Sequence, residues 1–96
     1  MPLWYSKPIR YMFLTWTAPV GGSDPNSISG YNIYRGTITG GPYTKLNTLS
    51  TIPATSYNDF QVNPGTQYFY VVTSVDSVGA ESAFSVEFSG TTQGPP

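Results

Sequence analysis

The amino-acid sequence predicts an all-β fold, an antiparallel sandwich of two sheets with about seven strands. Short runs rich in β-branched and aromatic residues alternate with turn signals made of Gly, Pro, Asn and Asp. No apolar period of 3.6 residues persists between the Gly and Pro positions, so we expect no amphipathic helix. With 96 residues and no Cys, the chain can bury one modest core without disulfides. A single β-sandwich domain is therefore predicted.

The N-terminal stretch carries more aromatic side chains than one face of a sheet can bury. A short β-prone run at residues 3–5 precedes a longer predicted strand at 9–17. Because strand side chains alternate, one face of the longer strand carries Met12, Leu14 and Trp16. Something must cover the aromatic residues that this face does not accommodate. The five aromatic residues of the stretch are Trp4, Tyr5, Tyr11, Phe13 and Trp16.

The middle of the chain predicts three shorter strands separated by polar loops. The strand at 30–36 places Tyr31 and Ile33 on one face and Tyr34 on the other. Lys45 is expected near a sheet edge, where a charge discourages pairing with other chains. The three strands are expected at residues 30–36, 43–46 and 56–59.

The longest strand is expected at residues 66–76, directly after the turn signal Pro64-Gly65. Both faces of this strand carry apolar groups. A strand of this kind needs a covering layer on each face, or it presents one face as a binding surface. One face carries Tyr68, Tyr70 and Val72, and the other carries Phe69, Val71 and Val75.

A hairpin loop at residues 77–82 and a last strand complete the predicted sandwich. Gly79 is expected to supply a positive φ in the loop. Alternation with polar neighbours predicts that the last strand is half-buried through three apolar residues, Phe84, Val86 and Phe88.

Several stretches, in this order and spacing, resemble the fibronectin type III module over about residues 14–92. The resemblance is greatest to the tandem modules of bacterial extracellular enzymes and surface proteins. It implies an immunoglobulin-like antiparallel β-sandwich in which strands A, B and E face strands C′, C, F and G. The stretches that carry it are Leu14-Thr15-Trp16-Thr17-Ala18-Pro19, Ile28-Ser29-Gly30-Tyr31-Asn32-Ile33-Tyr34-Arg35-Gly36, Thr55-Ser56-Tyr57-Asn58-Asp59, Val62-Asn63-Pro64-Gly65-Thr66-Gln67-Tyr68 and Val75-Asp76-Ser77-Val78-Gly79-Ala80-Glu81-Ser82.

The resemblance also implies the composition of the core. Trp16 would be the core tryptophan of strand B, and Tyr68 the tyrosine corner, with its hydroxyl bonded to backbone just upstream of Pro64-Gly65. A buried tyrosine hydroxyl needs a partner, and an adjacent turn offers free carbonyls. The expected structural core is Leu14, Trp16, Tyr31, Ile33, Tyr68, Tyr70, Val72 and Phe88.

Residues 1–13 depart from the family pattern, which usually begins with a longer lead and an A strand of small and aliphatic residues. The chain therefore divides into an atypical segment at 1–13, the module at 14–92 and the start of a linker at 93–96. One interpretation is a divergent A strand that still closes the sandwich edge. The other is an engineered or chimeric variant in which a second copy covers the aromatic residues, giving a homodimer by strand exchange or edge pairing through residues 3–13.

Composition excludes most chemistry. The net charge is −1 and the four cations are scattered, so neither a nucleic acid nor a membrane is an expected partner. Because His and Cys are absent, Ser-His, Cys-His and imidazole-metal sites are excluded. Asp76 and Glu81 could approach each other across the loop, but we interpret them as solvated rather than hydrolytic. Asp24 and Asn26 lack the ligand spacing of a calcium site. No catalytic residue, cofactor or metal is therefore expected.

Surface recognition remains as the expected role. Tyr34, Phe69 and Val71 should lie on the outer face of the larger sheet, where aromatic rings stack on sugars or partner domains, or only stabilise cross-strand pairs. We expect a non-catalytic spacer, or an interaction domain for a neighbouring domain, protein or carbohydrate ligand, in a larger extracellular or cell-surface protein. The candidate interaction residues are Trp4, Tyr5, Tyr11, Phe13, Tyr34 and Phe69.

Overall fold

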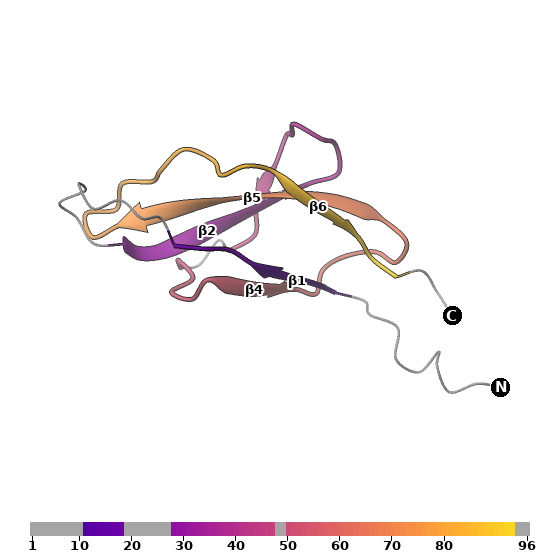
Figure 1. Cartoon of the computed structure of the whole chain (residues 1–96), viewed down its shortest axis with the longest axis horizontal. Helices are drawn as coiled ribbons and strands as arrows, with labels where there is room; N and C mark the ends of the chain where they lie inside the picture. Colours follow the sequence, from indigo (N-terminus) through magenta and orange to yellow (C-terminus); the bar gives the residue numbers. More distant parts are fainter. Residues whose placement is uncertain (1–10, 19–27, 48–49, 94–96) are drawn as a thin grey trace.

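The structure, a computed structural model, describes residues 11–18, 28–47 and 50–93 (Figure 1). Every regular element within these ranges is a β-strand, and all strand pairs are antiparallel. The predicted all-β fold is therefore confirmed. Over the same ranges, no helix is long and apolar enough to cross a membrane. The strands are β1 (Met12–Thr15), β2 (Ile28–Gly36), β3 (Thr44–Lys45), β4 (Ser56–Asp59), β5 (Gln67–Asp76) and β6 (Phe88–Thr91).

The strands form two sheets that face each other across the core. β1 pairs with β4, and the larger sheet has the order β3-β2-β5-β6 (Figure 1). This arrangement matches the family topology, with β1 and β4 as strands B and E and the other four as C′, C, F and G. The described ranges hold six strands, where about seven were expected. The run at residues 3–5 and most of the atypical segment lie outside the described residues.

Local chemistry accounts for the bounds of the central strands. Gly65, with φ at 64°, forms the turn that precedes β5, and Gly79, with φ at 89°, forms the turn that follows it. β4 has the predicted bounds, and β5 starts one residue later than expected. β2 starts two residues earlier than expected, because a register shift between Ile28 and Gly30 extends its pairing with β5.

The core lies between the two sheets and consists largely of aromatic residues. Trp16 packs edge-on against Tyr31, with ring centroids 5.4 Å apart, and Phe88 stacks on Tyr70 at 5.9 Å. Trp16 and Phe88 are partly buried residues that pack against the central cluster. The buried indole N–H of Trp16 has no hydrogen-bond partner among the described residues. The central cluster contains the other six residues expected in the core: Leu14, Tyr31, Ile33, Tyr68, Tyr70 and Val72.

The hydroxyl of Tyr68 forms a hydrogen bond with the backbone at the predicted position, but as an acceptor and not as the expected donor. It accepts a hydrogen bond of 2.7 Å from the backbone N–H of Asn63, immediately upstream of Pro64-Gly65. We expected the hydroxyl to donate to a carbonyl. The bond instead satisfies a backbone donor at a turn that has no ladder partner there.

The last strand differs from the prediction, because it begins only at Phe88. Phe84 and Val86, expected to share its buried face, are 53% and 88% exposed. The preceding segment contacts β5 through Ser82 and Ser85, and each serine uses both its N–H and its hydroxyl. Their N–H groups donate to the carbonyls of Ser74 and Val72, while their hydroxyls accept from the N–H groups of the same two residues.

This contact gives the segment a period of three rather than two. Ser82 and Ser85 face Ser74 and Val72 of β5, and Phe88 pairs with Tyr70. The segment thus advances three residues for every two of β5, whereas two paired β-strands advance residue for residue. The alternation of Phe84, Val86 and Phe88 therefore did not indicate a shared face.

With this three-residue period, the segment before β6 covers part of the outer face of the larger sheet. Its Phe84 packs against Tyr34 of β2. Val71 and Thr73, on the outer side of β5, are each only 2% exposed. Val71 therefore lies on the outer face of the larger sheet, as expected, but it is covered there and offers no exposed surface. The segment between β5 and β6 follows β5 along its length (Figure 1).

Candidate functional site

The outer face of the larger sheet carries a set of aromatic and acidic side chains, which we call the outer-face cluster. Glu81, Phe84 and Glu87 come from the covering segment at every third position and contact Tyr34 of β2 or Tyr43 next to β3. The period of three places these side chains on one side of the chain. The outer-face cluster consists of Tyr34, Tyr43, Glu81, Phe84 and Glu87.

Glu81 lies at one end of the outer-face cluster and is held by three donors. Its Oε2 atom accepts hydrogen bonds from the Thr73 hydroxyl at 2.6 Å, from the Asn32 amide at 3.2 Å and from the Tyr34 hydroxyl. Hydrogen bonds from Thr73, followed by that from Tyr34, lower the pKa of Glu81. The pKa of Tyr34 is raised, first by burial and then by its bond to Glu81. Glu81 is therefore a fixed anion at neutral pH.

Glu87 at the other end ties the covering segment to the turn between β2 and β3. Its Oε2 accepts from the Thr39 hydroxyl at 2.7 Å, and its Oε1 accepts from the Gly40 N–H at 2.7 Å and from the Tyr43 hydroxyl. The hydrogen bond from Tyr43 is the largest cause of a lowered pKa of Glu87, and the same bond raises the pKa of Tyr43. Glu87 thus stabilises a turn that would otherwise project from the sheet.

Phe84 lies between the two tyrosines and remains half open to solvent. Its ring meets Tyr34 at a centroid distance of 5.1 Å and Tyr43 at 5.5 Å, in both cases edge to face. Edge-to-face pairs of this kind fix ring orientation. Phe84 therefore presents an exposed aromatic surface in a defined position.

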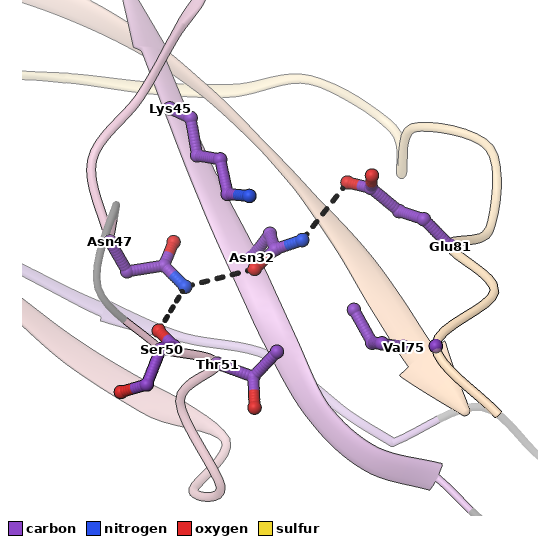
Figure 2. Close-up of a pocket in the computed structure, with 8 residues that line it drawn as sticks. Asn32, Lys45, Asn47, Ser50, Thr51, Val75 and Glu81 are labelled. Carbon is purple, nitrogen blue, oxygen red and sulfur yellow. Dashed lines mark hydrogen bonds between the residues drawn. The ribbon is translucent and has the colours of Figure 1, made fainter. Parts of the chain in front are cut away.

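Two hollows adjoin Glu81, one on each side. The polar hollow has a volume of about 290 Å³, and Asn32, Lys45 and Ser50 contribute to its lining. The aromatic hollow has a volume of about 360 Å³ and is lined in part by Tyr34 and Phe84. Glu81 lines both hollows. Figure 2 shows Lys45 and Glu81 on opposite sides of the Asn32 amide.

A buried asparagine supports the polar hollow from below. The Asn47 amide donates to the Asn32 side-chain oxygen at 2.9 Å and to the Ser50 carbonyl at 2.8 Å (Figure 2). Its Oδ1 accepts from the Ile33 N–H at 2.8 Å, so the side chain replaces a strand partner of β2. Asn32 in turn donates to Glu81, which links Asn47, Asn32 and Glu81 in one hydrogen-bonded chain.

A second polar network lies at the far end of the core and has a structural role. Asp59, 3% exposed, pairs with Arg35 at 2.7 Å and accepts from the Tyr70 hydroxyl at 2.9 Å. The Arg35 guanidinium lies 5.2 Å from the centroid of the Tyr68 ring. Burial, followed by the bond to Asp59, raises the pKa of Tyr70. Both charges are satisfied by the chain itself.

The candidate interaction residues predicted from sequence lie on different surfaces. Tyr34 belongs to the outer-face cluster, and Phe69 is a half-buried residue of β5 on the same side of the sheet. Phe13, 62% exposed, is on β1, and Tyr11 packs against Phe60 at 5.0 Å beside the smaller sheet. Trp4 and Tyr5 lie outside the described residues. The structure thus separates Tyr11 and Phe13 from Tyr34 and Phe69.

The acidic residues weighed for chemistry have separate surroundings. The Asp76 carboxylate caps its own loop, accepting from the N–H groups of Val78 at 3.0 Å and Ala80 at 2.8 Å, while Glu81 bonds to the sheet. Asp24 and Asn26 lie outside the described residues. Across the described ranges, no group of three or more acidic, His or Cys residues could hold a metal ion.

Three residues of the outer-face cluster were not predicted as interaction residues from sequence, namely Tyr43, Phe84 and Glu87. The spacing Glu81-x-x-Phe84-x-x-Glu87 in the sequence could have indicated that the side chains at 81, 84 and 87 share one side of the chain. The alternation of Phe84, Val86 and Phe88 in the same stretch concealed it.

The chain is similar to short segments of larger enzymes. No protein-family model matches it. It is 37% identical over 65 residues to an amylopullulanase of Thermoanaerobacterium saccharolyticum, a match that covers 68% of the chain and 5% of the enzyme. It is 34% identical over 83 residues to exoglucanase B of Cellulomonas fimi, covering 86% of the chain and 6% of that enzyme. The chain therefore spans only about a twentieth of these relatives.

A solved structure matches over most of its length. The crystal structure of an Fn3-like protein from Clostridium thermocellum superposes with a TM-score of 0.69 and is 37% identical in sequence. The match covers 91% of this chain and 79% of that one. The two chains therefore share their fold over most of their length.

Proposed function

The chain belongs to the fibronectin type III (Fn3) family, and on that premise we propose that it is a non-catalytic module of a larger extracellular enzyme that acts on glucans. The relatives that support this proposal are an amylopullulanase and an exoglucanase, both named for glucan substrates, and the chain matches about a twentieth of each. In such an enzyme the module spaces neighbouring domains and offers a surface for a protein or carbohydrate.

The main support for a non-catalytic module is that its carboxylates are already engaged in hydrogen bonds within the chain. Asp59, Asp76, Glu81 and Glu87 all accept hydrogen bonds from the chain's own groups. Glycoside hydrolysis usually needs two carboxyl groups that flank the scissile bond, one to donate a proton and one to act as base or nucleophile. Carboxylates that already accept hydrogen bonds from loops, turns and the core of the chain are poorly suited to these catalytic roles.

An assay for reducing ends tests the assignment. The purified chain, incubated with pullulan, soluble starch and a soluble cellulose derivative, should release no reducing ends above the buffer control. Release that is lost in Glu81→Gln or Glu87→Gln would make the chain an enzyme and overturn the proposal.

We propose self-association as a second role, favoured by the exposed side of β1. Phe13 is 62% exposed, and a hollow of about 200 Å³ beside β1 is lined in part by Met12, Leu14 and Phe88. A second copy that bound through residues 3–13 would cover such apolar surface. Sedimentation at several concentrations should show a dimer that Phe13→Ser weakens and Ile38→Ser, a change at another exposed position, leaves intact. A monomer at every concentration would refute this role.

A further inference from the structure

We propose that the two hollows beside Glu81 form one binding site for a neutral glucan chain. This inference rests on the proposed function, since it assigns a ligand class and a location to the surface of the module. The two hollows share Glu81 and together combine an aromatic part with a polar part. A pyranose ring has the same two features, an apolar face of C–H groups and a rim of hydroxyls.

The aromatic hollow offers a surface for the apolar face of a sugar ring. Phe84 is 53% exposed and is held in place by edge-to-face contacts with Tyr34 and Tyr43. Because its neighbours already restrict the ring, binding orders few additional side-chain torsions. The tyrosine hydroxyls are bonded to Glu81 and Glu87, so the rings keep their orientation without a ligand.

The polar hollow holds unused hydrogen-bonding groups of both kinds. All three bonds to Glu81 end on Oε2, and Oε1 accepts none from the described residues. The Lys45 ammonium and the Ser50 hydroxyl also have no hydrogen-bond partner in the described ranges. A free acceptor, a cation with three donors and a hydroxyl therefore border one hollow, which suits the donor and acceptor demands of adjacent sugar hydroxyls.

The charge of the site favours a neutral ligand. Lys45 and Glu81 are the charged residues that line the polar hollow, and their charges cancel. An anionic ligand would gain from Lys45 but would be repelled by Glu81, whose lowered pKa keeps it ionised. A glucan chain carries no charge and can use both groups through its hydroxyls.

The position of Glu81 is set before any ligand arrives. Thr73, Tyr34 and Asn32 hold the carboxylate, and buried Asn47 holds Asn32. A bound sugar would thus meet a rigid acceptor, which lowers the entropic cost of binding. Because both hollows are open and shallow, we expect weak binding that becomes useful next to a catalytic domain through effective concentration.

Titration of the full chain with maltohexaose and cellohexaose tests the inference. Amide chemical shifts should change around Asn32, Lys45 and Glu81, with saturation by at least one of the two sugars. Phe84→Ala and Lys45→Ala should each weaken binding about tenfold, the effect of losing one stacking or charged contact. Phe60→Ala removes a ring that is 67% exposed, on the other side of the sandwich, and should have no effect.

Three outcomes would overturn the inference. They are no saturable binding of either sugar, shifts centred on β1 or Phe60, or equal losses in Phe84→Ala and Phe60→Ala. None of them would make the chain an enzyme, which only the reducing-end assay decides. Conversely, hydrolysis would refute the proposed function even if both sugars bound at this site. The amide spectrum of each variant checks that it is folded. Because Phe84 and Lys45 are exposed, their substitution should leave the core signals unchanged.

Discussion

The two faces of β5 are buried to the same degree by different physical means. On the inner face, Tyr70 and Val72 are 0% and 5% exposed and pack against side chains of the opposite sheet. On the outer face, Val71 and Thr73 are each 2% exposed, and the covering segment is attached through Glu81 and Glu87 as well as through the hydrogen bonds of Ser82 and Ser85 to β5. Close packing buries one face, and charge-assisted hydrogen bonds hold the cover of the other.

Burial alone therefore does not determine how each face of β5 responds to a substitution or to pH. A packed aromatic core cannot collapse easily around a deletion, so lost contacts become a cavity. A single covering segment can settle onto a smaller side chain, but part of its attachment depends on the ionisation of its carboxylates. The inner face should therefore be sensitive to volume and the outer face to pH.

The largest effect is expected at the ion pair between Arg35 and Asp59, which reaches the core. Asp59→Asn leaves Arg35 without its anion and weakens the bond to Tyr70, which should lower the free energy of unfolding by about 3 kcal/mol. Chemical denaturation of the variant measures the loss. Asp76→Asn, which keeps an acceptor at a half-buried loop cap, should cost less, about 0.5 kcal/mol.

A double variant separates the charge from the packing at this end of the core. Adding Arg35→Met to Asp59→Asn removes the unpaired cation and should recover part of the lost stability. If the double variant is less stable than Asp59→Asn alone, stacking of Arg35 on Tyr68 matters more than the ion pair.

An intermediate effect is expected for a matched pair of neighbours on β5. Val72→Ala on the inner face should lower the free energy of unfolding by about 2 kcal/mol, since two methyl groups and their packing are lost. Val71→Ala on the outer face should cost about 1 kcal/mol, because the covering segment can close the gap. Urea denaturation measures both, and equal costs would mean that the outer layer is as rigid as the core.

Much of the fold could be predicted because its signals are local. Alternation and turn residues located β2, β4 and β5 within two residues, and the turn at Pro64-Gly65 located the partner of the Tyr68 hydroxyl. These features depend on residues close together in the chain. Sequence reasoning is reliable where neighbours in sequence are also partners in space.

The covering of the outer face could not be predicted, because the sequence patterns there conflict or involve residues far apart in the chain. The stretch 81–88 contains two periods, and the structure follows the period of three since Ser82 and Ser85 use their hydroxyls as well as their N–H groups in pairing with β5. Asn47 lies in a loop that is polar by composition, yet its side chain is buried and completes the edge of β2. Only the tertiary arrangement shows that such side chains replace backbone partners.

The smallest effect, and the one specific to the outer face, is on the pH dependence of stability. The pKa values of Glu81 and Glu87 are lowered from the model-peptide value of 4.5, so the unfolded chain binds more protons than the folded one in mild acid. Their contribution is fully present above about pH 4.5 and is lost as the pH falls through the folded pKa values. Tyr34 and Tyr43 have the corresponding effect at alkaline pH. Their pKa values are raised above 10, so their contribution to stability is fully present below about pH 10 and is lost as the pH rises through the folded pKa values.

The double variant Glu81→Gln/Glu87→Gln tests this pH dependence. It should unfold at a midpoint that varies less with pH below about 4.5 than that of the native chain, because two groups with lowered pKa values are gone. Thermal unfolding across the acid range measures the slope, and Val86→Ala, an exposed change in the same segment, should leave the slope unchanged. If the double variant keeps the native slope, the acid sensitivity arises elsewhere in the chain. The outer face would then be held by packing, and the contrast between the two faces of β5 would disappear.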